Sequence, residues 1–145
     1  GRLAHDFKNI VGVKDATGKV ERVSEQRMTC GKDFIQLSGE DITALGFNAH
    51  GGTGCISVTA NVAPRLMSEM CRAVLAGDIA GARACNDRLL PLHRKLFVEA
   101  NPIPVKWALA QMGRIANELR LPLTPLSPQH HDAVRSALRE AGIAS

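Results

Sequence analysis

The chain contains no tyrosine and one tryptophan, and aromatic residues make up only 3% of its 145 residues. Stacking surfaces for nucleic-acid bases are therefore almost absent. The formal net charge of +4 comes from Lys and Arg scattered through helical stretches rather than gathered in one patch. Without a basic cluster or a recognised nucleic-acid-binding module, the sequence predicts no nucleic acid among the partners.

Long hydrophobic runs are also missing. No apolar stretch approaches the length needed to cross a bilayer, so we expect no association with a membrane. Residues 1–6 lack the apolar core of a signal peptide, and the chain has no initiator Met. We therefore expect a processed piece of a longer protein, or one half of a split enzyme.

No two cysteines have the close spacing of a zinc knuckle or a redox motif; the four are Cys30, Cys55, Cys71 and Cys85. Their apolar or small neighbours favour buried free thiols in a reducing compartment, so a cytoplasmic location is predicted. His130 and His131 point apart on a helix without a Cys or carboxylate cluster, and Gly51–Gly54 lacks the lysine and spacing of a phosphate loop. We expect no metal and no cofactor.

Short apolar strands alternate with helical patterns in the first half of the chain, which is typical of βα units and a parallel sheet. Strands are predicted over Asn9–Lys14, Asp33–Ser38 and Gly54–Thr59. Thr17 is expected to cap the first helix. The apolar face of that helix would be provided by Val20, Val23 and Met28.

Beyond Gly77 the strand patterns stop, and the remaining sequence is typical of helices separated by proline-bearing turns. A helix is predicted over residues 78–99, with a kink at Pro91 because proline lacks a backbone donor. Asn101 and Ser127 each precede a proline and are predicted to cap the helices that follow.

Lys14 closes an apolar strand, where a charged ammonium loses hydration and the neutral, nucleophilic amine is favoured. Alternate side chains of a strand share a face, so Gly12 should lie on the side of Lys14 and leave space beneath its amine. Two other interpretations remain for a lysine at this place: its side chain extends into solvent, or it pairs with Asp15.

The segment Gly12–Gly18 resembles the Schiff-base lysine motif of the dihydrodipicolinate synthase and N-acetylneuraminate lyase family of pyruvate-dependent aldolases. The likeness continues through Leu37–Asp41, Gly51–Asn61, Pro91–Phe97 and Asn101–Trp107. These blocks extend over nearly the whole chain, and the last two are most similar to the dihydrodipicolinate synthase branch. Family enzymes are (β/α)8 barrels with a helical C-terminal extension, and this chain resembles only their C-terminal half.

The resemblance implies an α/β fold, with the last three βα units of a TIM barrel over residues 1–77 and the helical extension over residues 78–145. A complete barrel needs about 250 residues, so this chain cannot close one alone. An unclosed sheet exposes a hydrogen-bonding edge on each side and an apolar face. We therefore expect a complementary N-terminal barrel half or a homo-oligomer as partner.

The resemblance also implies that Lys14 forms an imine with pyruvate, which then reacts as an enamine with a small aldehyde. The backbone near Ile56 would contact pyruvate, and Gly39 would leave room beside its carboxylate. On their own, these two residues equally fit a core isoleucine and a turn glycine. Family members relay protons through tyrosine, so the chain alone, which has none, is expected to be inactive.

Three functions stay open at this point. In the first, the chain is part of an enzyme that condenses pyruvate with aspartate semialdehyde for lysine biosynthesis. In the second, it is part of an enzyme that cleaves sialic or other sugar acids to pyruvate. In the third, it is a truncated, non-catalytic assembly piece. A Lys14 amine in open solvent, or on the opposite side of the sheet from Gly39 and Ile56, would contradict the aldolase interpretation.

Overall fold

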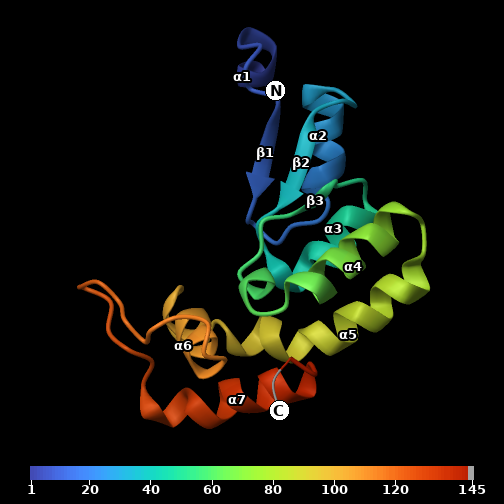
Figure 1. Cartoon of the computed structure of the whole chain (residues 1–145). Coiled ribbons are helices and arrows are strands. Elements are labelled where there is room, and N and C mark those ends of the chain that lie inside the picture. Colours follow the sequence, from blue (N-terminus) through green and yellow to red (C-terminus); the bar gives the residue numbers. More distant parts are fainter. Residues whose placement is uncertain (144–145) are drawn as a thin grey trace. The chain divides into compact units, whose positions relative to one another are not determined.

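A computed structural model describes residues 1–143. Within them, three strands form one parallel sheet in the order β1-β2-β3, with β1 over Gly12–Asp15, β2 over Ile35–Ser38 and β3 over Gly54–Cys55 (Figure 1). Each strand is followed by helical structure, so the α/β class and the parallel sheet are confirmed. β3 is much shorter than predicted, because the chain leaves the sheet after Cys55 and reaches a 3₁₀ turn at Thr59–Asn61.

Seven α-helices occur among the described residues: α1 Arg2–Asp6, α2 Arg22–Cys30, α3 Ala44–Ala49, α4 Pro64–Leu75, α5 Ile79–Lys95, α6 Ile103–Gln111 and α7 His131–Glu140. Short 3₁₀ turns lie at Asp41–Thr43, Thr59–Asn61 and Pro128–His130. No helix in this part of the chain is both long and apolar enough to span a membrane.

The described chain divides into two compact units. Unit 1 comprises residues 1–57 and 70–83, and unit 2 comprises residues 58–69 and those from 84 onward. The predicted division at residue 77, into a barrel part and a helical extension, refers to the organisation of the family's enzymes and not to compact units. It stays a prediction.

In unit 1, α2 begins at Arg22 rather than near Thr17, and its N-cap residue Glu21 makes no side-chain capping bond. Thr17 is therefore not the cap; its hydroxyl donates instead to the Asp15 carboxylate. Val23 is fully buried as expected, but Met28 is 85% exposed. Residue 28 thus lies outside the apolar stripe that the helical spacing indicated.

In unit 2, Pro91 lies inside α5, and the helix continues past it to Lys95. Asn101 does not cap α6, because the helix begins only at Ile103 and its N-cap residue is Pro102. Ser127 occupies the cap position of the last 3₁₀ turn but makes no side-chain capping bond. The positions of the prolines therefore predicted where these helices begin better than which residues cap them.

Candidate functional site

The carboxyl ends of the three strands lie side by side in register. Lys14 is opposite Leu37 in the β1–β2 pair, and Leu37 is opposite Gly54 in the β2–β3 pair. The ladder continues past the strand ends, because the Gly39 amide donates to the Asp15 carbonyl at 2.8 Å and the Ile56 amide donates to the Ser38 carbonyl at 2.8 Å. The sequence-predicted residues therefore meet at one edge of the sheet.

Lys14, Gly39 and Ile56 share one face of the sheet. Residues in register point the same way and alternate residues of a strand share a face, so Leu37 links Lys14 to Gly39 and Gly54 links them to Ile56. Contact supports this assignment, since a methyl group added to Gly39 would lie 2.7 Å from Lys14 Cε. The arrangement that would have contradicted the aldolase interpretation, opposite faces, does not occur.

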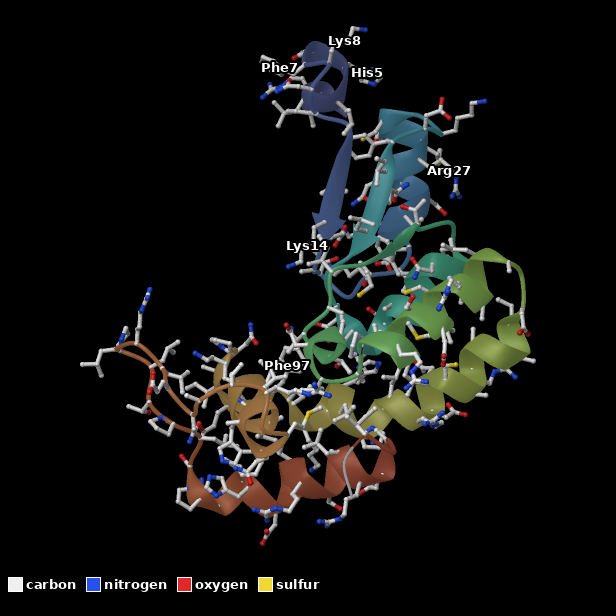
Figure 2. The ribbon with its side chains drawn as sticks, viewed as in Figure 1. His5, Phe7, Lys8, Lys14, Arg27 and Phe97 are labelled. Carbon is white, nitrogen blue, oxygen red and sulfur yellow. The ribbon has the colours of Figure 1, made fainter. Side chains whose placement is uncertain are left out.

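The Lys14 side chain is exposed in this chain, contrary to the expected burial. It projects from the end of β1, away from α2 (Figure 2). Among the described residues, no strand lies beyond β1 to cover this side, and Ile56 on the same face is 49% exposed. The other contradicting condition, a Lys14 amine in open solvent, is therefore met in the chain as it stands, because the sheet is open where Lys14 lies.

Of the two alternatives for Lys14, pairing with Asp15 is wrong and extension into solvent is what the structure shows. The Asp15 carboxylate pairs with Arg22 rather than with Lys14, with 2.7 Å between Arg22 Nε and Asp15 Oδ2. Extension into solvent does describe the side chain here. The space beside Gly12 is not left for the amine, since a methyl group there would meet Ile35 Cβ at 2.7 Å.

A shallow hollow of about 470 Å³ runs along the outer edge of β1. Its lining includes the apolar residues of residues 9–13, together with Lys14, Ile35 and Leu37. Gly39 and Ile56 do not line it. The hollow therefore marks the uncovered edge of the sheet rather than a finished substrate pocket.

Asp15 is a feature that the sequence analysis missed. Its side chain lies on the face opposite Lys14, is 5% exposed, and accepts hydrogen bonds from Thr17, Arg22 and Gln26. Burial alone would raise the pKa of Asp15, but these hydrogen bonds outweigh it and hold the pKa well below its usual range. An acid directly after a strand-end lysine, with an arginine seven residues on, was the available signal.

Substituting Asp15 by Asn is expected to lower the free energy of unfolding at pH 7 by about 1–3 kcal/mol, because it leaves buried donors without their charged acceptor. A depressed pKa in the folded state gives stability that is present above the unfolded-state value of 3.8 and is lost as the pH falls below it. Urea unfolding at pH 7 and pH 3 measures this. The difference between the two proteins should shrink at pH 3; an equal difference at both values would contradict the prediction.

All four cysteines are free, as predicted, but each is half-buried rather than buried. Burial, with a smaller effect of nearby Asp41, raises the pKa of the Cys55 thiol to about 12, and burial also raises the pKa of Cys71. Thiols held in the protonated form are poor nucleophiles and poor metal ligands. Cys55 Sγ donates to Asp41 Oδ1 at 3.6 Å, on the face of the sheet opposite Ile56.

The adjacent histidines have separate structural partners in unit 2. His131 stacks on Trp107 with 4.5 Å between ring centroids, and His130 Nε2 lies 3.7 Å from Glu99. Trp107 is 2% exposed, so it packs inward. Among residues 1–143, no group of three His, Cys, Asp or Glu side chains is placed to hold a metal ion.

Lys14, Gly39 and Ile56 meet at the carboxyl ends of three parallel strands. This is the edge of the sheet at which α/β proteins bind small ligands. The family model of the dihydrodipicolinate synthetase family matches residues 1–141. The chain belongs to this family.

Two curated relatives illustrate the match. The 4-hydroxy-tetrahydrodipicolinate synthase of Mesorhizobium japonicum is 62% identical over 143 residues, which cover 99% of this chain and 49% of the relative. The same-named protein of Brucella suis is 59% identical over 143 residues, with the same two coverages. The chain spans about half the length of the curated relatives it matches.

Solved structures agree with the sequence match. A chloride-inhibited dihydrodipicolinate synthase from Acinetobacter baumannii, complexed with pyruvate, superposes with a TM-score of 0.93 at 48% identity, covering 99% of this chain and 49% of that one. The enzyme from Thermotoga maritima gives 0.93 at 41% identity, covering 99% and 50%. This chain therefore has the fold of about half of such a protein.

Proposed function

We propose that this chain supplies the Schiff-base lysine of a pyruvate-dependent aldolase of the dihydrodipicolinate synthase type, and that a complementary N-terminal barrel half completes the site. One observation carries the proposal: Lys14, Gly39 and Ile56 lie on one face, at the carboxyl ends of three adjacent parallel strands. A relative at 62% identity that bears the synthase name supports it.

In the proposed reaction, the neutral Lys14 amine attacks the ketone carbon of pyruvate and water leaves, giving an imine. The protonated imine nitrogen withdraws electrons from the adjacent methyl carbon, which loses a proton and becomes the enamine nucleophile. That carbon then bonds to a small aldehyde. By analogy with the relatives, the aldehyde is aspartate semialdehyde; the backbone near Ile56 and the open position at Gly39 would contact pyruvate.

Exposure of Lys14 contradicts a working site in this chain alone, and the proposal accounts for it by an incomplete barrel. β1 is an edge strand, and Val11 just before it and Val13 within it are 60% and 36% exposed, so its outer edge is free to pair with another strand. We infer that these are the last three βα units of a (β/α)8 barrel, and that the missing strands would cover the exposed face. Water exclusion would then favour the neutral amine.

Borohydride reduction in the presence of pyruvate tests the proposal. The chain is mixed or co-expressed with the N-terminal half of the Mesorhizobium japonicum relative, and a stable carboxyethyl adduct should form on the peptide containing Lys14. The chain alone should give far less adduct, because its amine is solvated. A folded, completed barrel that yields no adduct, or yields it on another lysine, would overturn the proposal.

A further inference from the structure

We propose that Asp15 is the positioning residue for Lys14, because its buried carboxylate fastens the end of β1 to the following loop and to α2 and so sets the direction of the amine. This inference rests on the proposed function. It assigns no contact with substrate to Asp15, whose side chain lies on the opposite face of the sheet from Lys14.

The carboxylate is saturated with donors. Oδ1 accepts from the Thr17 amide at 3.0 Å and from the Thr17 hydroxyl at 2.6 Å. Oδ2 accepts from Arg22 Nε at 2.7 Å and from Gln26 Nε2 at 2.6 Å. An ionised carboxylate offers about four acceptor positions, so none remains for the Lys14 ammonium. All of these bonds hold the end of β1, on the face of the sheet opposite the Lys14 amine.

The position of Asp15 transmits this restraint to the site. Its carbonyl accepts the Gly39 amide at 2.8 Å, while its side chain binds α2 through Arg22 and Gln26. A single residue therefore connects three segments: the end of β1, the end of β2 and the first turns of α2. Rotation of the Asp15 peptide would carry Lys14 away from Gly39, against which its side chain packs.

The need for such a restraint follows from the side chain of lysine. A four-carbon stem on an exposed surface has many rotamers, and only its base can be fixed by the backbone. Displacement of a reacting group by about 1 Å can cost about 10²-fold in rate. Losing the anchor should therefore slow imine formation more than it reduces the amount of folded protein.

The test measures the rate of imine trapping against pyruvate concentration in the completed barrel, expressed per folded molecule by circular dichroism. Asp15→Asn should lower the saturating rate by about 10- to 100-fold. Asp33→Asn serves as control, since Asp33 is exposed and none of the described side-chain hydrogen bonds or ion pairs involves it. A saturating rate for Asp15→Asn equal to the wild type would overturn the inference.

Variants of Arg22, the ion-pair partner of Asp15, keep the inference testable if Asp15→Asn fails to fold. Arg22→Leu should also lower the saturating rate, and Arg22→Lys should restore part of it; a wild-type rate for Arg22→Leu would overturn the inference. Where Asp15→Asn does fold, Asp15→Asn with Arg22→Leu should be no slower than Asp15→Asn alone. Independent, additive losses would contradict a shared anchor. Absence of any adduct with the wild-type chain would instead count against the proposed function, so the two failures are distinguishable.

Discussion

Covalent capture of pyruvate by the completed barrel is expected to fall by at least about 10³-fold when Lys14 is replaced by Arg, because a guanidinium keeps the charge but does not act as the amine nucleophile. The substitution keeps a long, positively charged side chain at the end of β1. Mass spectrometry after borohydride reduction measures the loss directly.

Lys19→Arg is the control for this substitution. Lys19 is exposed and lies five residues further on, in the loop between β1 and α2. Its replacement should leave the trapped fraction unchanged, since its amine has no assigned role. Comparable adduct formation by the Lys14 and Lys19 variants would show that trapping is an unspecific reaction of surface amines.

The sequence predicted the sheet because its signals are local and repeated. Three short apolar runs alternate with helical patterns. β2 and β3 fall within the predicted ranges, and β1 begins inside its predicted range but ends one residue beyond it, at Asp15. The meeting of Lys14, Gly39 and Ile56 on one face followed from strand periodicity together with a family resemblance. Neither signal alone was sufficient, since a turn glycine and a core isoleucine are common.

What the sequence did not predict depends on contacts between segments. Threonine is a common helix cap, but the Thr17 hydroxyl donates to the nearby Asp15 carboxylate instead, and α2 begins only at Arg22. β3 comprises only Gly54 and Cys55, although the amides of Thr53 and Ile56 on either side of it still donate to β2 carbonyls. Burial of Lys14 was inferred from its place at the end of an apolar strand, but no strand among the described residues covers that side of β1.

Replacing Gly39 by Ala is expected both to destabilise the folded chain and to slow imine formation. The added methyl group would lie 2.7 Å from Lys14 Cε and 2.8 Å from Ala16 Cβ. The lysine side chain can swing away, but Ala16 Cβ is held by the backbone. We therefore expect Gly39→Ala to lower the free energy of unfolding by about 1–3 kcal/mol and to slow imine formation about 10- to 100-fold.

Gly46→Ala provides the matched control, because its methyl group would meet only Val20 Cγ1, at an ordinary 3.5 Å, inside helix α3. Alanine in a helix should stabilise the protein by about 0.5–1 kcal/mol and leave capture unchanged. Thermal unfolding and borohydride trapping on both variants separate the two effects. Gly39→Ala could instead lose stability but keep the wild-type rate of imine formation per folded molecule. That result would contradict the predicted displacement of Lys14 and would show that Gly39 is only a packing residue.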